Sequence, residues 1–148
     1  MTSNASLVSF VDSAVAYVKT NGREKALAEF NNPNGSFIKG ELYIYAYDFN
    51  GTTLALPFNP EKIGINRMNE IDPQGEFFIW NMSDAARNGS GYSWYYYANS
   101  AQNNTVEAKL GYVEKVDDDW FLGSCVYSGP AVTVTTNGLN ATKARNQP

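Results

Sequence analysis

The sequence predicts an α+β fold, with helices near its N-terminal end followed by an antiparallel sheet of about five strands. Apolar residues recur at three- and four-residue steps over residues 6–20, which is the spacing of one face of a helix. Tyrosines alternate with aliphatic side chains before a turn at residues 48–51, as in a β-hairpin. Three further β-prone runs, separated by polar turns, follow residue 90.

The length of the chain sets the number of domains. With 148 residues it can bury one core but not two generous ones. We therefore expect a single domain over residues 1–148, with its core over about residues 6–128 and a C-terminal extension over residues 129–148.

The composition excludes several kinds of partner. The net charge is −4 and the pI is near 4.7, so no basic surface is available for nucleic acid. His is absent and Cys125 is the single cysteine, which removes the usual ligands of a zinc site. We expect no metal and no cofactor. No apolar run approaches the roughly 20 residues of a membrane helix, so we expect membrane contact only through segments outside this chain.

Two helices are expected at the N-terminal end. The first covers residues 6–20 and stops at Asn21-Gly22. The second covers residues 23–30 and is closed by a run of Asn, Pro and Gly over residues 31–35.

The hairpin over residues 40–57 is the clearest β structure in the chain. Asn50-Gly51 tolerates the positive φ of the turn, and residues 52–56 return as the second strand. Because side chains alternate across a strand, each face should carry one set: Tyr43, Tyr45 and Tyr47 on one side, and Leu42, Ile44 and Ala46 on the other. We expect the rest of the chain to cover this hairpin or to extend its sheet.

The second half of the chain should continue the sheet. Breakers over residues 58–72 predict a loop with a helical turn, and the apolar pattern of residues 76–87 predicts a helix. Strands are expected over residues 91–97, 106–116 and 120–127, paired as a meander. Residues 132–135 are also β-prone, and residues 140–148 are polar and should fray.

Several short motifs, in this order and spacing, resemble the single Cache family of extracytoplasmic sensor modules in microbial chemoreceptors and histidine kinases. They span most of the chain: Ala-Leu-Ala-Glu-Phe at 26–30, Asn-Pro at 32–33, Gly-Glu-Leu-Tyr at 40–43, Asp-Phe-Asn-Gly at 48–51, Leu-Ala-Leu-Pro at 54–57, Ile-Gly-Ile-Asn at 63–66, Asp-Pro-Gln-Gly at 72–75, Lys-Leu-Gly-Tyr at 109–112 and Gly-Ser-Cys-Val-Tyr at 123–127.

The resemblance implies a PAS-like fold, in which a long N-terminal helix packs on a central antiparallel sheet and a pocket lies between the sheet and the loops. It also implies binding of a small metabolite, often a short carboxylate or an amino acid, without chemical turnover. Two positions depart from the family. Leu56 stands where His is frequent, which makes the pocket less polar, and Cys125 stands where Gly is common.

An anion needs a cation or several donors in a partly dry pocket, and two residues are candidates for that cation. Lys109 lies at a strand position that the family motif also fills with Lys, and Arg67 lies in the loop expected to overhang the sheet. A solvated surface position is the competing interpretation for both residues.

Tyrosines combine an apolar ring with a hydroxyl donor, which suits the orientation of a small carboxylate. Tyr43 and Tyr45 share a strand face, so both should line the pocket if one does. Tyr95 is preferred to Trp94, which lies on the opposite strand face. Trp80, on the covering helix, is expected either in the pocket wall or in the core.

Two other classes of function compete with this interpretation. Paired carboxylates can hydrolyse glycosides, but Asp48 and residues 117–119 fall in turns, and no catalytic motif is present. The protein is therefore expected not to be an enzyme. A sugar-binding module could stack ligands on one strand face, using Tyr92, Trp94 and Tyr96. The predicted helices argue against such a module. Exposure of Trp94 would favour it, and burial of Trp94 beneath a helix would exclude it.

The sequence thus predicts a sensor domain outside the cytoplasm that serves signal transduction or chemotaxis and binds a small carboxylate or amino acid. The alternative is a secreted or surface-anchored module that binds carbohydrate or another solute without signalling output. A homodimer through the N-terminal helix is a further expectation. Seven Asn-X-Ser/Thr triplets also favour a location outside the cytoplasm, although polar loops produce such triplets by chance.

Overall fold

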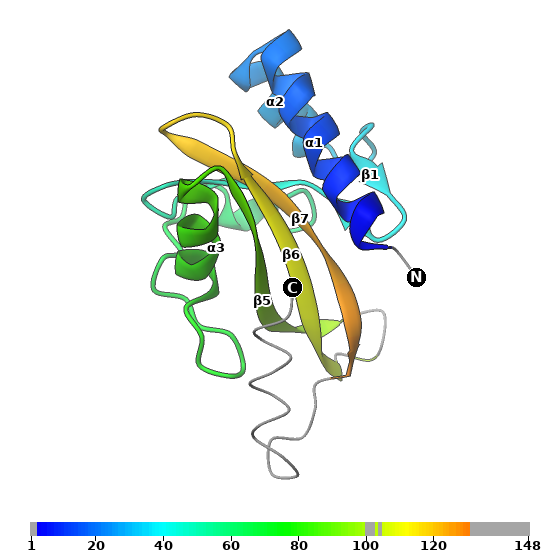
Figure 1. The fold of residues 1–148 in the computed structure, drawn as a ribbon, viewed down its shortest axis with the longest axis vertical. Coiled ribbons are helices and arrows are strands. Elements are labelled where there is room, and N and C mark those ends of the chain that lie inside the picture. Colours follow the sequence, from blue (N-terminus) through cyan, green and yellow to red (C-terminus); the bar gives the residue numbers. More distant parts are fainter. Residues whose placement is uncertain (1–2, 100–102, 104, 131–148) are drawn as a thin grey trace.

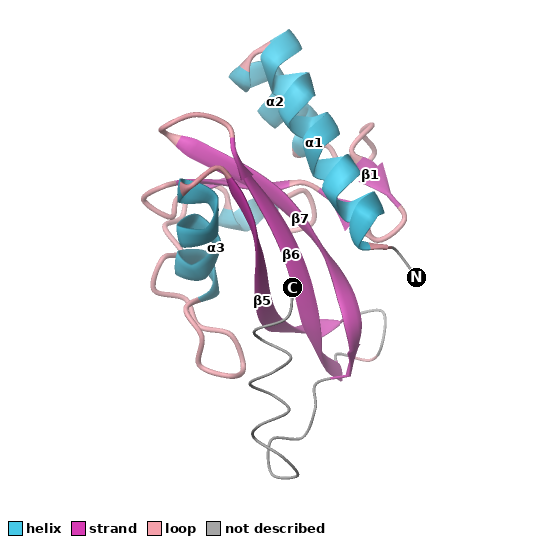
Figure 2. Cartoon of the chain, viewed as in Figure 1, coloured by secondary structure: helices cyan, strands magenta, loops and turns pink. Residues whose placement is uncertain are grey.

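A computed structural model describes residues 3–99, 103 and 105–130 of the chain. The fold has three layers, with a five-stranded sheet in the middle (Figures 1 and 2). The N-terminal helix α1 (Asn4–Asn21) covers one face of the sheet, and α3 (Phe78–Arg87) lies on the other. The predicted α+β class, with a long N-terminal helix on an antiparallel sheet, is confirmed.

The two N-terminal helices form where the sequence predicted them. Ser3 caps α1, because its hydroxyl accepts a hydrogen bond of 3.1 Å from the backbone N–H of Ser6. The helix ends at Gly22, whose φ of 87° favours a residue without a side chain. The second helix, α2, then covers Arg23–Phe30.

All strand pairs of the described residues are antiparallel. The five-stranded sheet has the order β4-β3-β7-β6-β5, and β5 to β7 pair successively as the predicted meander. The strands are β1 (Ile38–Lys39), β2 (Leu42–Tyr43), β3 (Tyr45–Asp48), β4 (Thr53–Ala55), β5 (Ser90–Asn99), β6 (Thr105–Lys115) and β7 (Trp120–Pro130).

The predicted hairpin exists, but its place and its first strand differ from the prediction. The β3–β4 hairpin forms one edge of the sheet, and β7 lies at the centre. Residues 42–43 leave the hairpin and pair with β1 in a separate two-stranded sheet. Two local features explain this. β4 is only three residues long, and Gly40, with a φ of 62°, turns the chain back onto β1.

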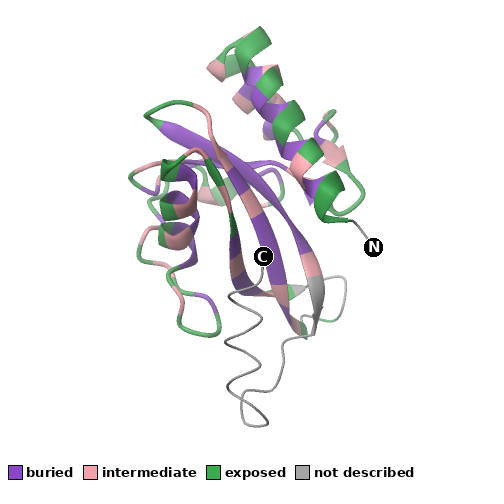
Figure 3. Cartoon of the chain, in the orientation of Figure 1, coloured by how far each residue is buried: buried purple, intermediate pink, exposed green. Residues whose placement is uncertain are grey.

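The alternation predicted for the tyrosine-rich strand is confirmed, and it separates two cores. Leu42, Ile44 and Ala46 belong to the core between α1 and the sheet, and Tyr45 and Tyr47 belong to the core beneath α3. Figure 3 shows the resulting pattern, with buried residues along the sides of α1 and α3 that face the sheet. The strands β3, β5, β6 and β7 therefore contribute to both cores.

The segment between β4 and β5 supplies the covering layer. It contains a short 3₁₀ helix, η1 (Pro60–Lys62), which is the predicted helical turn, and then α3. α3 begins two residues later than the predicted helix over residues 76–87. The β-prone residues 132–135 and the polar residues 140–148 lie outside the described residues.

Within residues 3–99, 103 and 105–130, no helix combines the length and the apolar character needed to cross a membrane.

Two carboxyl groups meet where α1 contacts the sheet, and they make stability depend on pH. Burial and the neighbouring Asp12 raise the pKa of Glu114 on β6 to about 7, with Lys19 acting in the opposite direction. In the unfolded chain a Glu carboxyl has a pKa of about 4.3. Between these two values the native state binds more protons than the unfolded state, so stability falls as pH rises.

We expect Glu114→Gln to remove this component. As the pH rises from about 5 to about 8, the urea midpoint of the wild type should decrease relative to that of the variant. Glu24→Gln makes the same change at an exposed position of α2. Its urea midpoint should change between the two pH values by as much as that of the wild type. Parallel pH profiles for wild type and Glu114→Gln would show that Glu114 titrates normally.

Candidate functional site

A small cavity lies between the sheet and the α3 layer, on the face opposite α1. Its volume is about 30 Å³, which is close to the space that one water molecule occupies. Aromatic side chains dominate its wall, together with two cations. The lining residues are Tyr43, Tyr45, Tyr47, Leu56, Asn59, Arg67, Phe78, Met82, Tyr95, Tyr97 and Lys109.

Lys109 occupies the middle of a row across three strands. It pairs with Tyr95 on β5 and with Tyr127 on β7, so the three side chains lie on the same face of the sheet. Its side chain is buried, with 5% exposure. The ammonium lies over four rings, at distances from Nζ to the ring centroid of 4.7 Å for Tyr127, 5.2 Å for Tyr97, 5.4 Å for Tyr95 and 6.0 Å for Tyr43.

The Lys109 ammonium is charged. Burial lowers the pKa of Lys109, but Cys125, Tyr43 and Tyr127 together raise it by more, so that the pKa lies above its ordinary value. In the described part of the chain, no carboxylate lies within ion-pair distance of Nζ. The ring faces attract the cation, but they accept no strong hydrogen bonds. The other groups near the ammonium, the Cys125 sulfur and the Tyr127 hydroxyl, are weaker acceptors than a carboxylate, so an anion would compete for its hydrogen bonds.

Arg67, the other predicted cation, is committed to protein partners. Its guanidinium donates two hydrogen bonds to the Glu70 carboxylate, of 2.7 and 2.8 Å, and one of 2.6 Å to the Tyr47 hydroxyl. It also lies over the rings of Tyr47 and Phe78. The positive charge of Arg67 is thus balanced by Glu70, whereas that of Lys109 is not.

Two glycines make room for Tyr45 on the sheet. A Cβ atom at Gly111 would lie 3.1 Å from the Tyr45 hydroxyl oxygen, and one at Gly123 would lie 3.0 Å from Cε1 of the same ring. The Tyr45 hydroxyl donates a hydrogen bond of 3.4 Å to the Ser124 carbonyl. The missing side chains on β6 and β7 therefore allow the aromatic ring to lie against the sheet as the cavity floor.

The tyrosine hydroxyls in the cavity are neutral donors. Burial raises the pKa of Tyr43 to about 12, with Lys109 acting in the opposite direction. Burial also raises the pKa of Tyr45 and of Tyr95 well above the ordinary value. The Tyr95 hydroxyl lies 3.3 Å from the sulfur of Cys125, which is buried.

Leu56 is held at the cavity by an amide from a distant part of the chain. The Asn31 side chain accepts a hydrogen bond of 2.9 Å from the Leu56 backbone N–H and donates one of 3.1 Å to the Leu54 carbonyl. The amide thus satisfies backbone groups where β4 ends. The Asn31 amide thereby holds the apolar side chain of Leu56 in the cavity wall.

Six of the seven residues predicted for the site line this cavity, and Trp80 does not. Trp80 is 51% exposed on the outer side of α3, so the prediction that it lies in the pocket wall or the core is wrong. The buried face of α3 is formed by Phe78, Ile79 and Met82. Position 80 lies about 200° around the helix from position 78, which turns Trp80 toward solvent.

Five lining residues were not predicted for the site. Tyr47 and Tyr97 share strand faces with Tyr45 and Tyr95, so the alternation of the strands could have identified them. Asn59, Phe78 and Met82 come from the α3 layer, and no local pattern indicates which of its residues reach the sheet.

The aromatic platform considered for sugars does not form. Trp94 is half-buried and packs against the core between α1 and the sheet, and its indole N–H is buried without a hydrogen-bond partner. Tyr92 lies against Tyr112 on the neighbouring strand. A ligand therefore has no flat surface on that strand face to stack upon.

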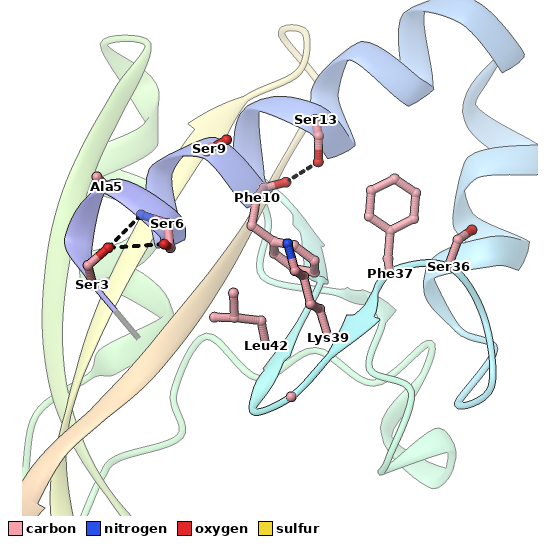
Figure 4. A pocket seen from close by; sticks show the side chains of 11 residues that line it. Ser3, Ala5, Ser6, Ser9, Phe10, Ser13, Ser36, Phe37, Lys39 and Leu42 are labelled. Carbon is pink, nitrogen blue, oxygen red and sulfur yellow. Dashed lines mark hydrogen bonds between the residues drawn. The ribbon is translucent and has the colours of Figure 1, made fainter. Parts of the chain in front are cut away.

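A larger groove of about 960 Å³ lies between α1 and the β1–β2 sheet, on the other side of the molecule (Figure 4). Most of its serine hydroxyls bond to neighbouring protein groups: Ser3 and Ser6 to each other at 3.0 Å, Ser13 to the Phe10 carbonyl at 2.7 Å, and Ser36 to the Glu29 carboxylate at 2.7 Å. Lys39 at its edge is exposed. Because nothing there is both buried and charged, we prefer the smaller cavity as the candidate site.

The loop before α3 is fastened to the sheet by one buried carboxylate. Asp72 Oδ1 accepts hydrogen bonds from the backbone N–H groups of Gln74 and Glu76, and Oδ2 accepts one from Tyr96 N–H on β5, each at 2.9 Å. The Tyr96 N–H faces outward because β5 is an edge strand. Asp72 thus holds the covering layer against the sheet and has a structural role.

Among the residues that the structure describes, no group of three His, Cys, Asp or Glu side chains is arranged to hold a metal ion.

Comparison with protein families matches residues 19–131 to the family described as single Cache domain 2. The match covers most of the chain. Comparison with curated protein sequences found no match.

Several solved structures share this fold. A methyl-accepting chemotaxis protein from Vibrio parahaemolyticus RIMD 2210633 is 26% identical, with a TM-score of 0.65 over 82% of this chain and 85% of that chain. The periplasmic sensor domain of a chemotaxis protein is 20% identical, with a TM-score of 0.65 over 82% and 87%. A Cache chemosensory domain, solved as the structural basis for carboxylic acid recognition, is 22% identical, with a TM-score of 0.63 over 82% and 84%.

We expect Asp72→Asn to destabilise the fold. In either orientation the amide places an N–H group against a backbone N–H, which costs about 1–3 kcal/mol when buried. Urea unfolding measures the loss. Asp84→Asn, at an exposed position of α3, should stay within about 0.5 kcal/mol of the wild type. Equal midpoints for Asp72→Asn and wild type would show that this carboxylate does not hold the loop.

Proposed function

This chain belongs to the single Cache domain 2 family, and we propose that it is a sensor domain whose cavity binds a small carboxylate through Lys109. The observation that carries the proposal is the Lys109 ammonium, which is buried and charged and has no carboxylate partner among the described residues. The domain senses and does not turn over its ligand. We also propose that the domain lies outside the cytoplasm.

A carboxylate complements the chemistry of the cavity wall. It would accept charge-assisted hydrogen bonds from Lys109, and the low dielectric of the buried site strengthens them. The hydroxyls of Tyr43 and Tyr95 are neutral donors that can orient the same group. Leu56, Phe78 and Met82 supply an apolar wall for a short carbon chain.

The charge balance of the cavity favours a simple carboxylate over an amino acid. Lys109 contributes one unbalanced positive charge, and Glu70 is already paired with Arg67 at 2.7 Å and Lys62 at 3.5 Å. The α-ammonium of an amino acid would therefore meet Lys109 without a free carboxylate to accept its hydrogen bonds.

Binding requires movement of the cavity wall. A volume of about 30 Å³ holds a water molecule but no organic acid. Phe58, 54% exposed, stands edge-on to Tyr43 at 5.4 Å between centroids, and the segment from Leu56 to α3 has little regular structure. Rearrangement of this segment around the ligand would commit the domain to a bound state.

The sheet offers a route for the signal. Lys109 and Leu110 are consecutive on β6, and they face the cavity and the core beneath α1 respectively. On the α1 side of the sheet, Trp120 Nε1 and Ser124 Oγ are buried without hydrogen-bond partners among the described residues. Because consecutive residues of β6 face the cavity and α1, a shift of this strand around the ligand would also move the side chains that pack against α1. Dimerisation through α1 stays a prediction.

We expect short carboxylates to stabilise the protein and Lys109→Met to abolish the effect. A ligand at about 100 times its Kd stabilises the native state by about 2.7 kcal/mol, which raises Tm by several degrees. Acetate, propionate, pyruvate and lactate are the acids to test in a thermal-shift assay. Lys39→Met, the same change at an exposed residue of β1, is the matched control and should respond as the wild type does.

An unchanged response of Lys109→Met would contradict the assigned site. Indifference of the wild type to every acid would contradict carboxylate sensing itself. The circular dichroism spectrum of each variant checks that it is folded.

We also expect propionate to bind more tightly than alanine, which differs only by the α-ammonium group. Titration calorimetry with the two compounds should give at least a tenfold difference in Kd, because like charges meet in the cavity. Tighter binding of alanine would show that the wall contains an acceptor for ammonium.

A further inference from the structure

A second concave site lies on the opposite side of α3 from the cavity. This Trp80 groove has a volume of about 430 Å³ and is lined chiefly by Met68, Asn69, Glu76, Phe77, Trp80 and Asn81. Small-molecule sites in proteins have volumes of about 300–1,000 Å³. Phe78 and Met82, on the inner side of the same helix, line the cavity, so α3 separates the two sites.

Two aromatic side chains of the groove are half exposed. Trp80 is 51% exposed and Phe77 is 50% exposed. They lie three residues apart and share one side of the helix with the exposed Asp84 and Arg87. Exposed aromatic rings next to each other mark interaction sites, because their contact with water is unfavourable. A ligand with a flat apolar face would cover them.

The polar groups of the groove indicate the rest of the ligand. Asn69 and Asn81 carry amides, which both donate and accept hydrogen bonds, and Glu76 carries a carboxylate. No Lys or Arg lines the groove, and the nearby Arg67 is paired with Glu70. The groove therefore does not suit an anion. It suits a neutral molecule with several hydroxyl groups.

We propose that the Trp80 groove binds a neutral saccharide. The apolar C–H face of a sugar ring stacks on Trp80 and Phe77, and its hydroxyls bond to Asn69, Asn81 and Glu76. The site differs in position from the strand face of Trp94. Because it uses no residue of the cavity, the proposal does not depend on carboxylate binding.

Indole N–H resonances provide the test. The chain has three Trp residues, so a ¹⁵N-labelled sample gives three indole signals. Glucose, galactose, N-acetylglucosamine and their β-linked disaccharides are titrated to about 50 mM, well above the roughly 1 mM Kd of a weak site. We expect the Trp80 signal to shift with at least one of them and the signals of the buried Trp94 and Trp120 indoles to stay in place.

Variants locate the binding. Trp80→Ala should weaken the saccharide by about tenfold or more, followed through the backbone amides of α3. Asn69→Ala, in an exposed loop where folding is not at risk, should weaken it several-fold. Tyr92→Ala, which removes a partly exposed aromatic ring on β5, is the matched control and should bind as the wild type does. Lys109→Met should also retain saccharide binding.

Three results would overturn the proposal. They are the absence of any saccharide-dependent shift at Trp80, undiminished binding by Trp80→Ala, and a Trp80 signal that moves with protein concentration instead of saccharide. The last result would identify the groove as a contact between two copies of the chain.

Discussion

The structure is organised around a buried positive charge on the middle of the sheet. An ammonium group removed from water costs several kcal/mol unless its surroundings compensate. Around Lys109 the compensation comes from the faces of four tyrosine rings, those of Tyr43, Tyr95, Tyr97 and Tyr127. This requirement accounts for tyrosines on three different strands, β2, β5 and β7. It also leaves the hydrogen bonds of the cation open to competition from an anion.

The sheet joins the two halves of the molecule because each strand has a cavity side and an α1 side. Gly111 and Gly123 let the Tyr45 ring lie against the cavity side, and Ile44 and Ala46 fill the core on the other. A strand cannot move on one face alone. Any adjustment of the cavity wall that shifts β3, β6 or β7 therefore changes the packing of α1, which is the coupling that a sensor domain needs.

Local patterns predicted much of the site, and long-range pairing limited the rest. Strand alternation placed Tyr45 and Tyr95 in the cavity, because the period of two holds wherever the strand runs. The predicted pairing failed before residue 44, where β2 pairs with β1 instead of continuing the hairpin, since pairing depends on which segments meet in the fold. Trp80 was misplaced because four consecutive apolar residues, 77–80, surround the helix start and do not define a face. The ion pair that commits Arg67 to Glu70 required the structure.

The Lys109 ammonium is the proposed anion site of the domain. A crystal structure grown with propionate tests it most directly. We expect a carboxylate oxygen about 2.8 Å from Lys109 Nζ, with the carbon chain against Leu56 and Met82 and the segment before α3 displaced. Propionate bound to Arg67 with Glu70 released, or found only outside the cavity while Lys109 stays against its four rings, would contradict it.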